Sequence, residues 1–502
     1  MKPAFRLRGH PLLYAICLHL AIGASLWGYN IGILSSVLVH PGFSKTLRDP
    51  PPSIRGIITG VYYVGTLLSY LFLAHPLADW LGRKRAAAIG TVVMVIGMWC
   101  MAAARGLLPL VIGRLACGLG VGIISTTVPL YQSEISPAKE RGKFVTMNHV
   151  GFIAGMAVGL WVGYGMSFWK TTSGDFWGWR FSIFLQIIPA TIFLLGLPFL
   201  PETPRWLVQQ GRKDEAKAIL YTLRPSSLAT QELDLISTST TRLPPTFSSF
   251  KRLTLSLFRD PALFARLWRA FLLQFMAQMC GAAAMKYYLP SLLQNLGLSV
   301  QSSLMAGAIE MTLKIGMTVV EMWIIDRLGR RLCLVLGSVI MGVAMLINGA
   351  LPLLYPNNMN KSADIICIMF IFIYAMGYSL GLGPAAWVYS SEIFPTSVRA
   401  RGLNLAASGG ALGSIIVSQI WPLGNAAFGS GIYFFFMVVN FACAPTIWFL
   451  YPETKGRELE DMDALFGKTD TQRELALGIN TDEQVSASPR ASGEEQDRLL
   501  AD

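Results

Sequence analysis

Long apolar runs separated by short polar links follow one another along almost the whole chain. A helix needs about 20 predominantly apolar residues to cross the hydrocarbon core of a bilayer. Twelve such runs are present, and they start near residues 12, 54, 86, 108, 143, 180, 265, 302, 332, 364, 402 and 428. The pattern predicts an all-α membrane protein with twelve transmembrane helices.

The links between the predicted helices fall into two classes by charge. Lys and Arg are concentrated in the links at residues 82–85, 139–143, 201–262, 326–331 and 397–401. Because cytosolic links carry the excess of basic residues, we expect this set, and both termini with it, to face the cytosol. The one Asn-X-Ser/Thr sequon, at Asn360, then lies outside the membrane, where a glycosylated asparagine belongs. This topology suits the plasma membrane.

Composition agrees with the membrane class and argues against several others. The 502 residues are 53% hydrophobic and only 14% charged, and the mean hydropathy is +0.49, which leaves too little polar surface for a soluble protein of this size. The net charge of +12 is spread over the links instead of forming one patch, which argues against nucleic-acid binding. The seven cysteines have no metal-type spacing, and no catalytic-triad or phosphate-loop pattern stands out. We expect no enzyme activity, metal or cofactor.

Three motifs recur about half a chain apart. The pairs are "DWLGRKR" (79–85) with "DRLGRRL" (326–332), "YQSEISPAKERG" (131–142) with "YSSEIFPTSVRARG" (389–402), and "PETPR" (201–205) with "PETKGR" (452–457). A parallel repeat of this kind predicts two six-helix bundles of the same orientation. The expected parts are a cytosolic N-terminus (1–11), a first bundle (12–200), a short helical linker in the cytosol (201–262), a second bundle (263–451) and a cytosolic tail (452–502), disordered from about residue 467.

The motifs also carry a family resemblance. "DWLGRKR", "GRLACGLGVG", "PLYQSEISPAKERG", "PETPRWL", "DRLGRR", "GPAAWVYSSEIFPTSVRARG" and "PETKGR" occur in this order and together resemble the sugar porter family of the major facilitator superfamily, nearest its fungal branch, over about residues 12–462. The resemblance implies a monomeric carrier whose bundles expose a midplane site alternately to the two sides of the membrane. The implied solute is a sugar, a polyol or a similar small polar molecule.

The positions that bind sugar in this family are only partly kept. Gln278 and the stacking Trp387 remain, whereas His149 replaces a glutamine, Lys314 replaces an asparagine, and Ser379 replaces an acidic residue. Loss of such hydrogen-bonding groups argues against an ordinary glucose site. The family's outer-gate positions are occupied by Tyr287 and Tyr288.

Three charges interrupt the apolar run that starts near residue 302. Glu310, Lys314 and Glu321 share one helical face, which cannot point at lipid. Either Glu310 and Lys314 neutralise each other and hold the helix, or Lys314 binds an anionic or highly oxygenated solute. With Lys286 and His149, Lys314 could make the cavity cationic, and we expect Gln278, Trp387 and Asn30 to bind the solute as well. A carrier of a small organic acid (a quinate-like carboxylate) or of a specialised metabolite is therefore the alternative function.

Two further alternatives belong to other classes of protein. A nutrient sensor on the transporter fold usually needs a longer cytosolic extension than this tail, and a drug exporter should show motifs of its own. Proton coupling is the remaining question, because proton-coupled family members carry an aspartate where this chain has Asn30, opposite Arg114. An amide cannot release a proton, so we expect facilitative transport unless Glu310 or His149 has taken over the proton.

Opposite charges in the repeated motifs are expected at cytosolic helix ends, where they could latch the two bundles together while the inner side is closed. The alternative is an anchor that fixes topology at the membrane interface. The expected pairs are Asp79 with Arg83, Glu134 with Arg141, Glu202 with Arg205, Arg330 with Glu392, and Arg399 with Glu453, and Arg331 is a further candidate. Arg401 is considered only as such an anchor.

Overall fold

A computed structural model describes residues 9–137, 141–239, 247–395, 398–455 and 466, and this part of the chain is built from helices. The N-terminal half contains α1 (His10–Val37), α2 (Pro41–Thr46), α3 (Pro52–Leu68), the π-helical turn η1 (Ser69–Leu73), α4 (Ala74–Leu81), α5 (Arg83–Ala102), α6 (Leu107–Ile135), α7 (Arg141–Met166), α8 (Thr172–Phe184) and α9 (Ile187–Gly196). Four shorter helices follow: α10 (Pro204–Gln209), α11 (Lys213–Leu223), α12 (Ser226–Ser239) and α13 (Phe247–Arg259).

The C-terminal half repeats the pattern of the first. It contains α14 (Pro261–Met279), α15 (Ala282–Asn295), α16 (Val300–Leu328), α17 (Arg330–Leu354), α18 (Lys361–Leu380), α19 (Pro384–Glu392), α20 (Arg399–Phe428) and α21 (Ile432–Leu450). Side-chain caps define several starts: the Asp260 carboxylate accepts hydrogen bonds from the first turn of α14, and the Ser299 hydroxyl does the same for α16.

The predicted membrane spans are present. Within the described residues, nine helical segments are long and apolar enough to cross a bilayer, and the segment Arg399–Leu450 contains both α20 and α21. The other two spans are α14–α15, which is interrupted between Met279 and Ala282, and α16, which carries the charged residues. Counted this way, the described residues contain twelve spans, as the sequence predicted.

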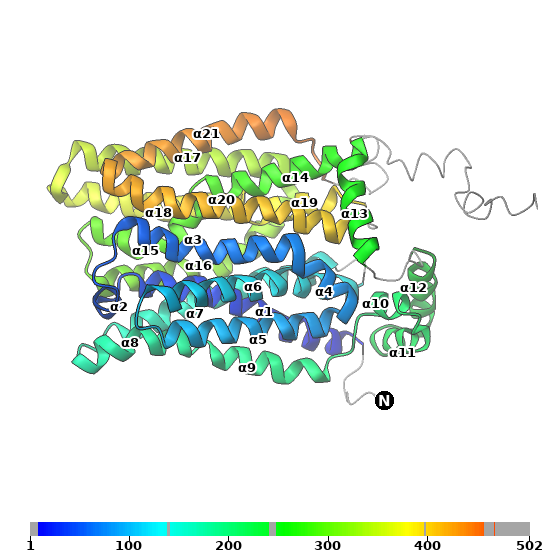
Figure 1. Cartoon of the computed structure of the whole chain (residues 1–502). Helices are drawn as coiled ribbons and strands as arrows, with labels where there is room; N and C mark the ends of the chain where they lie inside the picture. Colours follow the sequence, from blue (N-terminus) through cyan, green and yellow to red (C-terminus); the bar gives the residue numbers. More distant parts are fainter. Residues whose placement is uncertain (1–8, 138–140, 240–246, 396–397, 456–465, 467–502) are drawn as a thin grey trace, which may run out of the picture.

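The two halves lie side by side along nearly parallel helices (Figure 1). Most of the N-terminal half lies in the lower part of that view and most of the C-terminal half in the upper part, while α3, α15 and α16 overlap in the middle. The halves meet where α3 packs on α20 and where α7 packs on α16. The helices α10, α11 and α12 lie beyond one end of the bundle, at the end where α1 begins, and the Gly9 N–H there donates to the Thr222 carbonyl.

A glycine turn explains why the motif "DWLGRKR" (79–85) returns as "DRLGRRL" (326–332) in the second half. Gly82 separates α4 from α5 with φ 90°, and Gly329 separates α16 from α17 with φ 92°. A β-carbon would lie 3.0 Å from the Glu202 carboxyl carbon at the first site and 2.7 Å from a Glu453 oxygen at the second. Each turn therefore requires glycine. Residues with a β-carbon rarely adopt this backbone conformation, and a carboxylate fills the space that the β-carbon would occupy.

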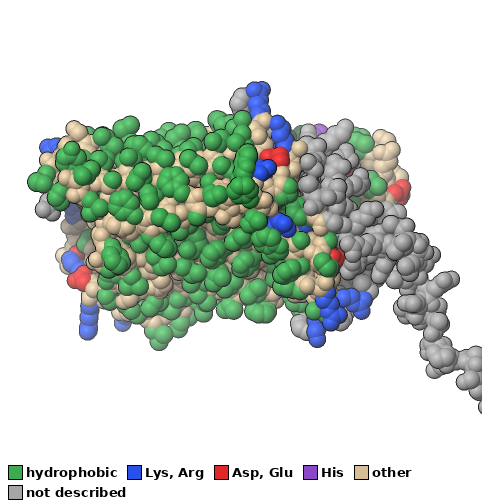
Figure 2. Space-filling model, turned by 90° about the horizontal axis from the view of Figure 1, so that it is seen from above, with side chains coloured by type: hydrophobic (Ala, Val, Ile, Leu, Met, Phe, Trp, Pro, Cys, Tyr) green, Lys and Arg blue, Asp and Glu red, His purple; other side chains and the backbone are tan. Residues whose placement is uncertain are grey.

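The outer surface agrees with a membrane setting. Figure 2 shows hydrophobic side chains covering the middle of the visible face, whereas Lys and Arg side chains gather towards its two ends. Large apolar side chains such as Leu18, Phe72, Leu195 and Phe449 are well exposed. A soluble protein would rarely expose so much apolar area, but lipid covers it favourably.

Candidate functional site

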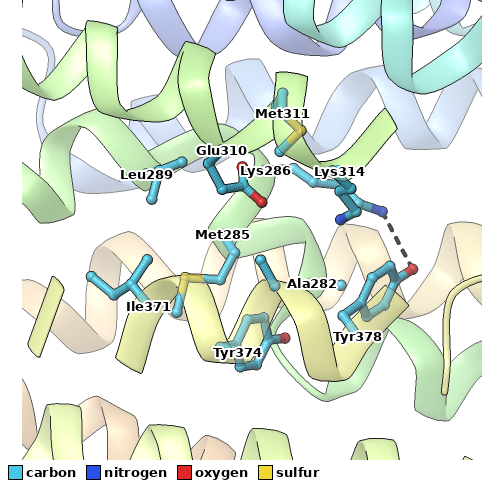
Figure 3. Close-up of a pocket in the computed structure, with 11 residues that line it drawn as sticks. Ala282, Met285, Lys286, Leu289, Glu310, Met311, Lys314, Ile371, Tyr374 and Tyr378 are labelled. Atoms are coloured by element: carbon cyan, nitrogen blue, oxygen red, sulfur yellow. Dashed lines mark hydrogen bonds between the residues drawn. The ribbon is translucent and has the colours of Figure 1, made fainter. Parts of the chain in front are cut away.

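A small cavity lies in the C-terminal half, between α15, α16 and α18 (Figure 3). The residues that line it are Ala282, Met285, Lys286, Leu289, Glu310, Met311, Lys314, Ile371, Tyr374, Ala375 and Tyr378. On α15 and α18 they recur three or four residues apart, so each helix contributes one face. The volume of about 20 Å³ is enough for a water molecule.

Two lysines converge on one phenol at one end of this cavity. The Lys286 ammonium donates to the Tyr378 hydroxyl over 3.5 Å and lies 5.0 Å from the ring centroid. The Lys314 ammonium lies 5.2 Å from the same centroid, so the ring faces two cations. Cation–π attraction of this kind is worth about 0.5–2 kcal/mol, which is small beside the cost of burying a charge.

The acidic residues of α16 do not neutralise these lysines by direct contact. Within the described part of the chain, no ion pair joins Glu310 to Lys314, and Glu310 Oε2 is buried without a hydrogen-bond partner. Glu321 is 1% exposed, and both of its carboxyl oxygens also have no hydrogen-bond partner. Of the two alternatives from the sequence, the self-neutralising pair is therefore not formed in this conformation.

Three other residues predicted to bind solute, Gln278, His149 and Trp387, are not among the residues that line the cavity. The Gln278 amide nitrogen donates to the Tyr378 hydroxyl over 3.4 Å, and Gln278 Oε1 is buried without a partner. His149, on α7 of the opposite half, packs beside Phe152 and lies within electrostatic reach of both cavity lysines. Trp387, on α19, is 37% exposed and is not among the lining residues, so the expected stacking platform is absent from this cavity.

Asn30 and Arg114 meet as the sequence predicted. The fully buried Arg114 guanidinium donates to the Asn30 side-chain oxygen over 2.7 Å and to the Ile58 carbonyl over 3.1 Å. The Asn30 side-chain nitrogen donates to Gln186 over 3.3 Å, and the guanidinium stacks 4.5 Å from the Tyr62 centroid. In this conformation, Asn30 therefore accepts a hydrogen bond from Arg114 and does not line the cavity, although we had expected it to bind solute.

The two tyrosines at the family's outer-gate positions join the halves on one side of the cavity. The Tyr287 hydroxyl accepts from Arg114 over 3.3 Å, and the Tyr288 and Thr59 hydroxyls share a hydrogen bond of 2.9 Å. The Tyr288 hydroxyl also lies 3.4 Å from the Ser418 carbonyl, to which it can donate instead. Because Thr59 and Arg114 belong to the N-terminal half, these contacts close this side between the halves.

A second closure lies on the opposite side of the cavity, and the sequence did not predict it. The buried Arg401 donates to the Tyr70 carbonyl over 3.2 Å, which links α20 to the π-helical turn η1. The Tyr70 ring packs on Ala407 and Ala411 of α20. The motif "RARG" contained the signal, but we had considered Arg401 only as a possible interface anchor, because sequence does not show which way an arginine points.

The predicted charge residues of the N-terminal half form one cluster. Arg83 binds the Glu134 carboxylate through two hydrogen bonds of 2.7 and 2.8 Å and Asp79 through one of 3.2 Å. The Glu202 carboxylate accepts from the backbone N–H of Arg83 over 2.8 Å. Burial raises the pKa of the Glu202 carboxyl, and these backbone hydrogen bonds oppose the rise. Glu202 thus stabilises the turn at Gly82, whereas we had expected it to pair with Arg205.

The C-terminal half contains the same arrangement. Arg330 donates to Glu392 over 2.9 and 3.2 Å, and the Glu453 carboxylate accepts from the backbone N–H groups of Arg330 and Arg331, each over 2.9 Å. The Arg399 side chain donates to the Phe394 carbonyl over 3.2 Å, so the expected Arg399–Glu453 pair is replaced by these contacts.

These ion pairs join helices within one half, whereas we had expected charges that bridge the halves. The side chain of Arg141, the expected partner of Glu134, lies outside the described residues. Asn360 caps α18, and its side-chain oxygen accepts from the Ser362 N–H over 3.0 Å.

Comparison with known proteins agrees with this geometry. The model of the family described as "Sugar (and other) transporter" matches residues 16–466. The MFS-type transporter criB of Aspergillus cristatus is 30% identical over 475 residues, covering 94% of this chain and 96% of the relative. The "Probable quinate permease" of Aspergillus niger is 31% identical over 475 residues, covering 90% and 88%.

A solved structure shows the same architecture. It is the proton:xylose symporter XylE bound to 6-bromo-6-deoxy-D-glucose, which aligns with a TM-score of 0.76 at 25% identity over 90% of this chain and 99% of XylE. The residues matched by the family model, 16–466, include both halves, the cavity and both charge clusters. The chain therefore belongs to the sugar transporter family of the major facilitator superfamily.

Proposed function

We propose that this sugar-transporter-type protein moves a small polar solute across the plasma membrane by alternating access. The observation that carries the proposal is the pair of thin closures on opposite sides of the cavity, at Tyr288–Thr59 and at Arg401–Tyr70. Each closure consists of a few side chains between the halves, so rocking one half against the other could open either side. Family membership favours a sugar or polyol as the solute.

The moving parts are the two bundles, at residues 12–200 and 263–451. The segment 201–262, the N-terminus (1–11) and the tail (452–502) lie on the cytosolic side, because the basic links gather there. The protein works as a monomer, without catalytic chemistry, and Asn360 is a glycosylation site on the outer side. Tyr287 and Tyr288 form the outer gate, and the charge clusters keep each half rigid as it moves.

Transport is facilitative in this proposal. The partner of the buried Arg114 is the amide of Asn30, which cannot exchange a proton. A proton-coupled version would have to use Glu310 or His149 instead. XylE is named as a proton:xylose symporter, so the two proteins would differ in this respect.

A small organic acid is the second candidate for the solute. The observation in its favour is the convergence of Lys286 and Lys314 on one phenol without a carboxylate in ion-pair contact among the described residues. His149 extends this positive region from the other half. The resemblance to a probable quinate permease is a weaker argument of the same kind.

Tracer counterflow tests the proposal. The purified full-length protein in liposomes should take up a labelled hexose, polyol or carboxylate saturably, and unlabelled solute on the opposite side should accelerate the uptake. Uptake should not change when a pH gradient is imposed. Binding of a solute without any flux would indicate a sensor, and a pH effect that disappears in Glu310→Gln would indicate proton coupling.

A further inference from the structure

The lining of the cavity between α15, α16 and α18 has two basic side chains and one acidic side chain, while Glu321, a second buried carboxylate within electrostatic reach of Lys314, lies outside the lining. The basic side chains are those of Lys286 and Lys314, and the acidic one is that of Glu310. Buried charges in proteins are normally paired, because an unpaired ion in a low-dielectric interior is costly. A solute with one negative charge would balance the lining.

The two neutral hydrogen-bonding side chains of the lining already have protein partners, which leaves the Tyr378 O–H as the donor that these contacts do not use. The Tyr374 hydroxyl donates to the Cys280 carbonyl over 3.1 Å, and the Tyr378 hydroxyl is held by Gln278 and Lys286. A polyhydroxylated solute would therefore find few partners here and would lose its hydrogen bonds to water. Hydroxyl recognition is consequently a poor explanation of this cavity.

The end of the cavity away from Tyr378 is mostly apolar. Met285, Leu289 and Ile371 form most of it, with the Glu310 side chain beside them and Met311 closer to the lysines, as Figure 3 shows. The two methionines have unbranched, flexible side chains, which can move aside when a solute enters a space that now has room only for water. The cavity is thus cationic at one end and mostly apolar and adaptable at the other.

We propose that the solute of this cavity is a monocarboxylate with a largely apolar ring, whose carboxylate binds between Lys286 and Lys314 and whose ring packs against Met285, Leu289, Met311 and Ile371. This inference rests on the proposed carrier function and narrows its substrate class. It favours the organic-acid alternative over a sugar, and an apolar body over a polyhydroxylated one.

Two compounds with the same carbon skeleton test the apolar body. Cyclohexanecarboxylate and quinate differ only in the four ring hydroxyls of quinate. The purified full-length protein in detergent is titrated with each, and its melting temperature reports binding because a ligand of the native state raises it. Cyclohexanecarboxylate should bind at least about tenfold more tightly than quinate, since the lining offers few hydrogen-bond partners to the four ring hydroxyls.

Three further probes test the charge. Methyl cyclohexanecarboxylate has the same ring without a negative charge, inorganic phosphate has the charge without the ring, and glucose has neither. None of the three should raise the melting temperature. The methyl ester also reports any effect of ring partitioning into the detergent.

Lysine variants assign the effect to the cavity. Lys286→Met and Lys314→Met should each weaken cyclohexanecarboxylate binding about tenfold or more, because each removes a charge-assisted contact. Lys170→Met, at an exposed lysine outside the cavity, should leave binding unchanged. Without ligand, both cavity variants should melt above the unmodified protein, since each removes the excess positive charge from the lining.

Several results would overturn the inference. These are tighter binding of quinate or glucose than of cyclohexanecarboxylate, a response to phosphate alone, or carboxylate binding that survives in both cavity variants. Failure of the inference and failure of the carrier proposal are distinguishable. Saturable glucose counterflow that persists in Lys314→Met would overturn the inference only, whereas carboxylate binding without flux of any solute would overturn the carrier proposal only.

Discussion

Arg83 shows how a single side chain can organise a membrane-protein half. Its guanidinium binds Glu134 through two parallel hydrogen bonds and also reaches Asp79, while its backbone N–H donates to Glu202. The side chains of Arg83 and Glu134 are only 4% and 6% exposed. A pair this deeply buried is costly to break, because removing one partner leaves the other charged and unpaired.

Glu134→Ala should therefore lower the free energy of unfolding by about 3–5 kcal/mol. The measurement is thermal or denaturant unfolding of the purified protein in detergent. The control is Glu215→Ala in the exposed Arg212–Glu215 pair, whose side chains are 51% and 56% exposed and which should contribute little to stability because solvent screens it. Equal effects of the two variants would contradict a structural role for the Arg83 cluster.

Asn30 allows a direct test of the coupling proposal. Asn30→Asp should place a titratable group 2.7 Å from an Arg114 nitrogen, because the substituted oxygen already accepts that hydrogen bond. Uptake by the variant in liposomes should then depend on pH, whereas uptake by the unmodified protein should not. Asn30→Ser, which keeps a neutral acceptor, is the control. A strong pH gradient effect in the unmodified protein would show that another group carries the proton.

At the residue scale, the sequence was informative where a motif fixes a contact. Arg114 with Asn30, Arg83 with Asp79, and Arg330 with Glu392 are all in contact. It failed for Tyr378, which contacts three of the predicted binding residues but belongs to no motif. Its role depends on how α18 is rotated about its axis, and spacing along one helix does not give that rotation.

At the scale of elements, the repeated glycine turns connect sequence and structure most closely. Gly82 and Gly329 adopt nearly the same backbone conformation, with ψ 160° at both, and each turn is filled by the carboxylate of a "PET" motif. The repeat was visible in the sequence, but the reason for it was not. The carboxylate lies more than a hundred residues from its turn in each half, and only the fold brings the two together.

Gly329→Ala should destabilise the protein by about 1–3 kcal/mol, because this backbone region is almost restricted to glycine and the new β-carbon would meet Glu453. Gly316→Ala is a matched control, since Gly316 lies within α16 and nothing lies within 4 Å of an added β-carbon. That variant should be neutral or slightly stabilising. Unfolding of both variants in detergent is the measurement, and equal stability would contradict the proposed role of the turn.

Helix existence was easier to predict than helix interruption or orientation. The run that starts near residue 265 was counted as one span, but the structure divides it into α14 and α15 beside the cavity. The π-helical turn η1 interrupts another span, where Tyr70 meets Arg401. Lipid-facing and core-facing positions are both apolar in such helices, so the hydrophobic pattern does not reveal which side is buried.

At the scale of the whole molecule, the two closures affect one equilibrium, between a state open on the Tyr288 side and a state open on the Arg401 side. Contacts at Tyr288 hold the halves together on one side, and contacts at Arg401 hold them together on the other. A change that weakens one closure should therefore favour opening on that side. The charge clusters would move with their own halves, because their hydrogen bonds stay within each half.

Tyr288→Phe should shift the population towards the state open at the Tyr288 side by about fivefold, the effect of losing one hydrogen bond worth about 1 kcal/mol. Arg401→Gln should shift it in the opposite direction. Distances between spin labels attached across each end of the bundle would report both changes. Tyr355→Phe, at an exposed tyrosine, is the control. Unchanged distances in Tyr288→Phe would show that this hydroxyl does not hold the closure.

The lysines of the cavity have a consequence for the direction of flow. A solute that balances Lys286 and Lys314 carries one negative charge across the membrane in each cycle. The interior of an energised cell is electrically negative, and moving one elementary charge through 100 mV is worth about 2.3 kcal/mol. At equal concentrations, voltage would then favour departure of the anion over entry by about fiftyfold. If the solute of this carrier is such an anion, the membrane potential would therefore favour export over import wherever the inside and outside concentrations are similar.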